Sequence, residues 1–303
     1  MPSRAAVIYS PRYQCDIGAH VFPMEKFERV LAELVATGAI RADDVQEPAP
    51  ASRAELELVH TGAYLDDLFT LRHTPRTAAS ELPLTREIVS AYALAAGGTT
   101  LAAREALARG AAINLGGGFH HAFADMASGF CYLNDLAVAL RVLEREGRYD
   151  RAAVVDVDLH QGNGTARIFR DDPRVFTFSI HQEHLYPVKE RSRLDIGLDD
   201  FTGDEEYLAR LADGLEQVWA SRPDLVLVQA GADPFEDDQL GSLRLTFAGL
   251  ERRDRMVLEG CAERRIPVAV TLGGGYSRRF EDLVRIHAAT CRVALALPAW
   301  AAA

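Results

Sequence analysis

The chain has 303 residues, of which 48% are hydrophobic and 25% are charged. This is enough apolar material for one large core, and the apolar runs are of strand length, far shorter than the roughly 20 residues that cross a bilayer. The net charge of −11 disfavours nucleic acid as a direct ligand, because phosphate binding needs clustered Lys and Arg, and it is compatible with cationic substrates.

The N-terminus leads directly into a strand pattern, without a separate apolar signal segment, so we expect a cytoplasmic protein. The four cysteines are scattered along the chain, and none of them belongs to a C-x-x-C pair. This spacing predicts neither a disulfide framework nor a thiolate zinc site. We expect four reduced, mostly buried thiols, at Cys15, Cys131, Cys261 and Cys291.

Short apolar runs rich in β-branched residues alternate with helical patterns along the chain. Strands are expected over residues 5–9, 111–115, 152–156, 175–180, 225–229 and 268–272, and helices over 86–109, 134–146, 205–220 and 250–264. Residues 72–83 and 182–204 look like loop insertions. The alternation predicts an α/β fold over residues 1–303: a single domain with an open parallel sheet and helices on both faces.

Glycines and polar side chains follow most of the expected strands. Leu115 precedes Gly-Gly-Gly-Phe-His-His, Val155 precedes Asp-Val-Asp-Leu-His, Gln229 precedes Ala-Gly-Ala-Asp, and Leu272 precedes Gly-Gly-Gly-Tyr. The carboxyl ends of parallel strands meet at one edge of the sheet, where ligands bind in open α/β folds. These segments are therefore expected to form one crevice.

A metal site is predicted at this edge. Asp158 and His160 are two residues apart at a strand end, so both side chains can project the same way, and Asp233 would supply a third ligand. Such a set, with nitrogen and oxygen donors and no cysteine, suits a catalytic ion that keeps an open position. Zinc is preferred, and ferrous iron or cobalt stay open.

A metal at this position would lower the pKa of water and polarise an amide carbonyl. Proton transfer then requires a group that titrates near neutral pH, and His120 and His121 are the candidates. Tyr276, which follows three glycines, can donate a hydrogen bond to a developing oxyanion.

The ordered motifs Gly-Gly-Gly-Phe-His-His-Ala, Asp-Val-Asp-Leu-His-Gln-Gly-Asn-Gly, Gly-Ala-Asp-Pro and Gly-Gly-Gly-Tyr resemble the arginase/deacetylase superfamily, specifically the zinc-dependent histone deacetylases. The resemblance covers nearly the whole chain, from Ile-Tyr-Ser-Pro-Arg-Tyr to Gly-Gly-Gly-Tyr-Ser-Arg-Arg. His-Val-Phe-Pro-Met-Glu-Lys, His-Leu-Tyr-Pro and Asp-Gln-Leu-Gly-Ser-Leu look most like the class IV branch and its bacterial relatives.

The resemblance implies a role for each motif residue. Zinc would be held by Asp158, His160 and Asp233, and Tyr276 would complete the oxyanion site. His121 would act as general base and general acid.

Under the same resemblance, His120 would stabilise charge with Asp156 behind it. Many relatives carry an aspartate behind the second histidine, whereas this chain has Asn163, which can orient the ring without adding negative charge. His121 is therefore expected to be less basic than it would be with a carboxylate partner.

A substrate tunnel and a second ion are also implied. The tunnel residues would be Gly129, Phe130, Tyr186, Gly274 and Gly275. A potassium or other monovalent ion would lie at Asp156, Asp158, His160, Ser179 and Ile180. The rim aspartate that anchors the substrate backbone in some relatives has no assignable counterpart within residues 72–83.

The sequence thus predicts a zinc-dependent deacylase that hydrolyses the amide of an acylated lysine, in a protein or peptide, or of a related acylated amine such as a polyamine. One alternative is a dinuclear amidinohydrolase of the same superfamily, but Gly162 and Phe235 stand where bridging aspartates would be needed. The other is a non-catalytic binder of acyl-lysine. Acyl length and oligomeric state stay open.

Overall fold

Eight parallel strands form one sheet in the order β2-β1-β3-β8-β7-β4-β5-β6. The structure is a computed structural model that describes residues 5–298. The strands are β1 (Ala6–Ile8), β2 (Val45–Gln46), β3 (Ala111–Asn114), β4 (Ala152–Asp156), β5 (Val175–Gln182), β6 (Leu194–Leu198), β7 (Leu225–Gln229) and β8 (Val268–Thr271).

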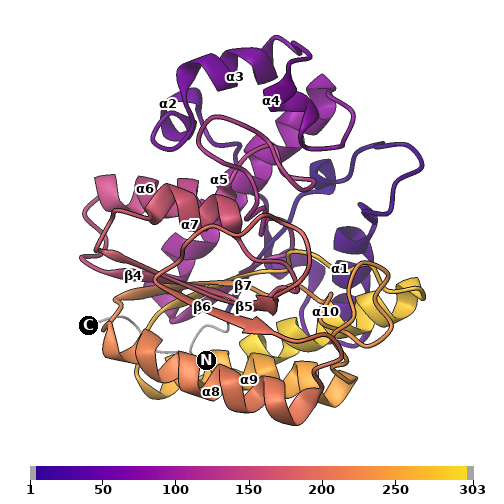
Figure 1. The fold of residues 1–303 in the computed structure, drawn as a ribbon, viewed down its shortest axis with the longest axis vertical. Helices are drawn as coiled ribbons and strands as arrows, with labels where there is room; N and C mark the ends of the chain where they lie inside the picture. Colours follow the sequence, from indigo (N-terminus) through magenta and orange to yellow (C-terminus); the bar gives the residue numbers. More distant parts are fainter. Residues whose placement is uncertain (1–4, 299–303) are drawn as a thin grey trace.

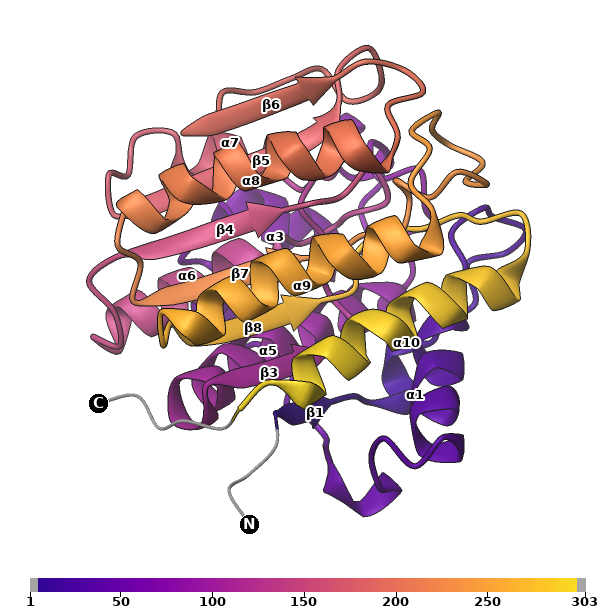
Figure 2. The same cartoon turned by 90° about the horizontal axis from the view of Figure 1, so that it is seen from below.

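Helices cover both faces of this sheet. The helices are α1 (Lys26–Ala36), α2 (Arg53–Leu56), α3 (Gly62–Phe69), α4 (Pro75–Ala78), α5 (Arg86–Arg109), α6 (Asp135–Arg145), α7 (Asn163–Phe169), α8 (Asp204–Ala220), α9 (Phe247–Glu263) and α10 (Phe280–Ala296). In Figure 1, α6 and α7 lie on the opposite side of the sheet from α8 and α9, and α2, α3 and α4 lie farthest from it. Figure 2 shows α8, α9 and α10 side by side across one face.

The burial of the strands explains this layered arrangement. Every residue of β3, β4, β7 and β8 is buried, whereas the edge strands β2 and β6 are partly exposed. Strands that are apolar throughout must be covered on both sides, which is typical of parallel sheets. The predicted α/β architecture is therefore confirmed. No helix within residues 5–298 has the length and apolar character needed to cross a membrane.

Local sequence signals determine where the longest helix, α5, begins and ends. At its start, the Thr85 hydroxyl accepts a hydrogen bond from the Ile88 amide at 3.2 Å. At its end, Gly110 adopts a φ of 95°, a conformation that glycine takes without a steric penalty. The helix predicted over residues 86–109 is found with these bounds.

Residues 182–204 were expected to be an insertion, but they contain β6. This strand pairs with β5 and adds an edge to the sheet. Its sequence, Leu-Asp-Ile-Gly-Leu, is short and contains Gly197 and a charged residue, so its strand pattern is weak. The expected loop 72–83 likewise contains the single turn of α4, capped by Thr74. All four cysteines are buried and free, as predicted.

Polar residues line up where the central strands end. Asn114 on β3 pairs in register with Thr271 on β8, which pairs with Gln229 on β7. Gln229 pairs in turn with Asp156 on β4, and Asp156 pairs with Ser179 on β5. The loops that follow these strands consequently leave the sheet side by side, as the sequence pattern predicted.

The sheet interior should tolerate truncation poorly. Leu227 in β7 is fully buried, so Leu227→Ala should lower the free energy of unfolding by about 2–5 kcal/mol because it opens a cavity. Val188 is 89% exposed, and Val188→Ala should change that free energy by less than about 0.5 kcal/mol. Urea denaturation followed by circular dichroism measures both changes. An equal effect of the two substitutions would contradict the assigned burial.

Candidate metal centre and active site

Three predicted ligands converge at the carboxyl edge of the sheet. The donor atoms of Asp158, His160 and Asp233 lie within 4.8 Å of one another, and all three residues are buried. The Nδ1 atom of His160 is 3.1 Å from Asp233 Oδ2 and 3.3 Å from Asp158 Oδ1. The loop after β4 supplies the first two side chains, and the loop after β7 supplies the third.

Surrounding hydrogen bonds fix both carboxylates. Asp158 Oδ2 accepts from Gln229 Nε2 at 2.7 Å and from the Gly274 amide at 3.1 Å, and Asp233 Oδ1 accepts from the Leu159 amide at 3.0 Å. These contacts leave Asp158 Oδ1 and Asp233 Oδ2 facing His160. Asp158 Oδ1 also accepts from the His160 amide at 2.9 Å, so backbone amides and Gln229 together hold both carboxylates beside the imidazole.

The three groups fit a metal ion. Burial opposes a charge on His160, but Asp158 and Asp233 outweigh it and raise the pKa of the imidazole to about 10. The carboxylates therefore draw a cation to this point, and a divalent metal can replace the proton between them. One nitrogen and two oxygen ligands suit a catalytic zinc ion. Among the described residues, this is the one group of three His, Cys, Asp or Glu side chains that could share an ion.

A second, bridged metal ion does not fit. A Cβ atom at Gly162 would overlap a carboxylate oxygen of Asp156, so an aspartate cannot replace this glycine without displacing the chain. Phe235 occupies the other position and packs on Phe247, with ring centroids 4.6 Å apart. These two positions therefore disfavour the dinuclear arrangement.

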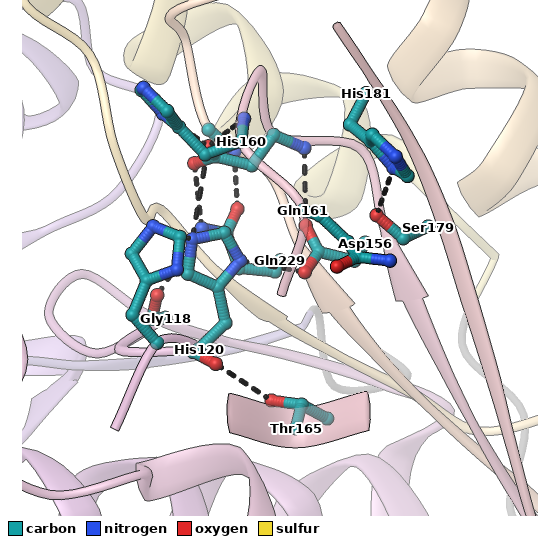
Figure 3. A network of polar contacts seen from close by, with 12 residues as sticks. Gly118, His120, Asp156, His160, Gln161, Thr165, Ser179, His181 and Gln229 are labelled. Atoms are coloured by element: carbon teal, nitrogen blue, oxygen red, sulfur yellow. Dashed lines mark hydrogen bonds and ion pairs between the residues drawn. The ribbon is translucent and has the colours of Figure 1, made fainter. Parts of the chain in front are cut away.

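Two histidines lie beside the predicted ligands, each with a different partner, and Figure 3 labels one of them, His120, together with its partner Asp156. His120 Nδ1 is 2.6 Å from Asp156 Oδ2, and His121 Nδ1 is 2.8 Å from Asn163 Oδ1. The two Nε2 atoms are 3.1 Å apart. Because a carbonyl oxygen only accepts, His121 Nδ1 carries a proton, and its Nε2 is unprotonated and faces His120 Nε2.

The two histidines differ in charge for this reason. Burial opposes the His120 cation, but the carboxylates of Asp156 and Asp158 outweigh it and raise the pKa to about 9. Burial, together with the charges of His120 and His160, holds the pKa of His121 well below its ordinary value. The site therefore contains a cationic histidine next to a neutral one.

Tyr276 lies on the loop after β8 and is buried. Its amide donates to Asp238 Oδ2 at 2.7 Å, and its carbonyl oxygen accepts from Gln239 Nε2 at 2.8 Å. Burial, reinforced by nearby carboxylates, raises the pKa of the phenol well above its usual value. Tyr276 thus keeps its proton and can act as a hydrogen-bond donor.

The glycines before Tyr276 allow the backbone to lie against the ligands. A Cβ atom at Gly274 would lie 2.5 Å from Asp233 Oδ2 and 2.8 Å from Asp158 Oδ2, too close for any side chain. Gly275, also predicted to line the tunnel, instead faces Leu283, to which a Cβ atom would come too close. Its proposed contact with substrate stays a prediction.

Two adjoining cavities share His121, His160 and Tyr276 in their walls. The inner one has a volume of about 20 Å³ and is lined by residues that include Phe22, Cys131, Asp158, Gly274 and both histidines. The outer one, of about 240 Å³, is lined by Glu81, His121, Gly129, Phe130, His160, Leu185, Tyr186, Leu240 and Tyr276. A larger hollow of about 920 Å³, bordered by α5 and Phe69, contains none of the predicted site residues.

Aromatic rings border the outer cavity. The Phe130 ring lies 6.0 Å from that of Tyr276, and the Tyr186 ring lies 5.4 Å from His121. The Tyr186 hydroxyl is 2.8 Å from Ser128 Oγ. The structure therefore brings Phe130 and Tyr186, both predicted as tunnel residues, into one cavity.

The predicted residues of the monovalent cation site also lie together. Asp156 and Ser179 are register partners on β4 and β5, and Ile180 follows. Figure 3 shows Ser179 turned toward His181, whose Nδ1 is 2.9 Å from its hydroxyl oxygen. An ion at this position stays a prediction.

Sequence reasoning missed three residues near the ligands. Gln229 was noted only as a strand end, although it binds Asp158 directly. Lys26 is fully buried on α1, and its ammonium donates to the Gly273 carbonyl. Glu81 lines the outer cavity, within the segment where no rim carboxylate could be assigned. A polar residue that ends an apolar strand was an available signal for Gln229. Lys26 closes the His-Val-Phe-Pro-Met-Glu-Lys motif, although no role was assigned to it, and no pattern identified Glu81.

Known proteins resemble this chain over most of its length. The model of the histone deacetylase domain matches residues 20–292. An uncharacterized protein of Picosynechococcus is 44% identical over 95% of this chain and 97% of its own length. Histone deacetylase 2 of Arabidopsis thaliana is 33% identical over 91% of this chain and 76% of its own.

Two further comparisons agree. The acetoin utilization protein AcuC of Bacillus subtilis is 33% identical, covering 89% of this chain and 76% of its own. The crystal structure of a histone deacetylase homologue from Aquifex aeolicus superposes with a TM-score of 0.82 and 25% identity, covering 96% of this chain and 84% of the other. With its parallel sheet, its Asp-His-Asp group and a domain match that spans most of its length, the chain belongs to the histone deacetylase family.

Proposed function

We propose that this protein is a zinc-dependent deacylase that hydrolyses the amide of an acylated lysine, or of a related acylated amine. The observation that carries the proposal is the buried Asp158, His160 and Asp233 group, next to two histidines with different partners. Curated relatives named histone deacetylases support the same reaction. Ferrous iron or cobalt could occupy the same ligands.

When bound, zinc would polarise the amide carbonyl and make water more acidic. His121 is neutral and its Nε2 is unprotonated, so it is suited to accept a proton from water and to pass it to the leaving amine. The cationic His120 stabilises the negative charge that develops nearby. Tyr276 supplies a hydrogen-bond donor for the substrate oxygen.

The outer cavity suits the aliphatic stem of an acyl-lysine. Its volume of about 240 Å³ and its walls of Phe130, Tyr186 and Leu240 favour an extended apolar group over a charged one. Glu81 at its edge is exposed and offers the only carboxylate of this lining. We propose that the Glu81 carboxylate accepts hydrogen bonds from the backbone amides of the substrate that flank the acylated lysine.

A monovalent cation such as potassium is proposed beneath the zinc, at Asp156, Asp158, His160, Ser179 and Ile180. The support is the adjacency of these residues at the ends of β4 and β5. Such an ion would offset some of the negative charge of Asp156 and Asp158.

Removal of a ligand and removal of the proton acceptor should have different effects. Asp233→Ala should abolish zinc binding, whereas His121→Ala should retain zinc and lose roughly 10²–10⁴-fold in turnover. Elemental analysis and an assay with acetyl-, trifluoroacetyl- and longer acyl-lysine peptides measure both effects. His73→Ala, at an exposed histidine, serves as the control. A wild-type protein that binds zinc but releases no acid from any peptide would instead support the non-catalytic binder.

The partner of His121 should set the acid limb of the pH profile. A base must be unprotonated to act, so kcat/KM should fall only when the pH drops below the depressed pKa of His121. Asn163→Asp adds a negative charge at the same position and should raise that pKa. The acid limb should consequently move to higher pH, as measured from kcat/KM between pH 5 and 8. An unchanged limb would exclude His121 as the base.

Glu81 should affect binding more than chemistry. Glu81→Ala should raise KM for acyl-lysine peptides by roughly tenfold with little change in kcat, because a hydrogen bond to an exposed carboxylate contributes modestly. The comparison substrate is an acylated amine without a peptide backbone, whose KM should stay constant. A rise in KM confined to the small acylated amine would show that Glu81 recognises a cationic group instead of the peptide backbone.

A further inference from the structure

A fully buried arginine, Arg253, lies behind the loops that carry the candidate metal ligands. It belongs to α9, which lies over one face of the sheet between α8 and α10 (Figure 2). A guanidinium in the protein interior is costly unless its charge and its N–H groups are matched. Its partners therefore indicate what the residue does.

The charge is matched by the next residue. Arg253 Nε donates to Asp254 Oδ1 at 2.8 Å, and Nη2 lies at the same distance from that oxygen. The other oxygen of Asp254 accepts from the Thr290 hydroxyl of α10 at 2.6 Å. The ion pair is thus held in one orientation by a neighbouring helix.

The remaining nitrogen connects two loops. Arg253 Nη1 donates to the carbonyl oxygen of Val157 at 3.1 Å and to that of Gly231 at 2.6 Å. Val157 immediately precedes Asp158, and Gly231 is two residues before Asp233. A single guanidinium nitrogen therefore bridges the two loops that supply the aspartate ligands.

The spacing of these loops determines the spacing of the ligands. The Gly231 backbone lies against both carboxylates: a Cβ atom there would overlap Asp158 Oδ2 and lie 2.8 Å from Asp233 Oδ1. A shift of either loop would therefore alter the gap between the carboxylates. Metal ligands tolerate deviations of only about 0.2 Å, and the guanidinium is a rigid planar donor.

We propose that Arg253 is a positioning residue of the metal centre, which fixes the separation of Asp158 and Asp233 by binding both of their loops. The inference rests on the proposed function, because it assumes that these residues bind a metal. Loss of Arg253 should weaken metal binding and alter the coordination geometry, although no ligand is removed.

The main test is the double variant Arg253→Met/Asp254→Leu, which removes the bridge and leaves no unpaired charge. Replacing a buried ion pair by apolar residues of similar size is often neutral for stability, and the Thr290 hydroxyl keeps a bond to the Ile286 carbonyl. The zinc dissociation constant, from competition with a chromophoric chelator, should rise by roughly 10- to 100-fold. The visible absorption spectrum of the cobalt-substituted protein should change.

Two further variants make the outcome decisive. Arg255→Met, at an exposed arginine of the same helix, should bind zinc as the wild type does. Arg253→Lys keeps the charge but not the planar fork, so it should also bind zinc more weakly, and it answers the question if the double variant does not fold. If the double variant binds zinc within twofold of the wild-type affinity and its cobalt spectrum is unchanged, the role of Arg253 is overturned and the proposed function still stands. A wild-type protein that binds no divalent metal would overturn the proposed function as well.

Discussion

The constraint on which the rest of the site depends is the burial of two carboxylates beside one imidazole. Asp158 and Asp233 lie close together at a sheet edge where solvent is excluded, an arrangement that is unfavourable without a compensating cation. Hydrogen bonds donated by Gln229, Gly274 and Leu159 to the two carboxylates offset part of this unfavourable free energy. Asp158 Oδ1 and Asp233 Oδ2 both face His160, so the crowding of negative charge that is costly without a cation also favours the binding of a small, highly charged ion.

The histidine pair shows how two adjacent buried rings can acquire different charges. Both rings are buried and both donate from Nδ1 to an oxygen, but Asp156 carries a charge and Asn163 does not. The carboxylate keeps His120 protonated, and that charge in turn disfavours protonation of His121. In the proposed reaction the two adjacent histidines therefore take complementary roles, one electrostatic and one in proton transfer.

Much of this arrangement could be predicted from the sequence because it follows from local patterns. The bounds of β4 and β7 coincide with the apolar runs 152–156 and 225–229, and the polar residues after them predicted the three side chains that the structure brings together. The strand β6 was missed because Asp195 and Gly197 interrupt its apolar pattern. Glu81 was missed for another reason: its position at the cavity edge depends on how α4 and the following turn pack, which no local pattern encodes.

Arg253 illustrates the same limit more sharply. On a helix rich in charged residues, an arginine followed by an aspartate looks like part of a solvated face, and its neighbour Arg255 is indeed exposed. What distinguishes Arg253 is the tertiary environment, since Val157, Gly231 and Thr290 come from three other parts of the chain. A sequence can place ligands at strand ends, because a strand end is a local feature. The groups that hold two such ends at a fixed distance become visible only when the loops and the covering helix are placed together in space.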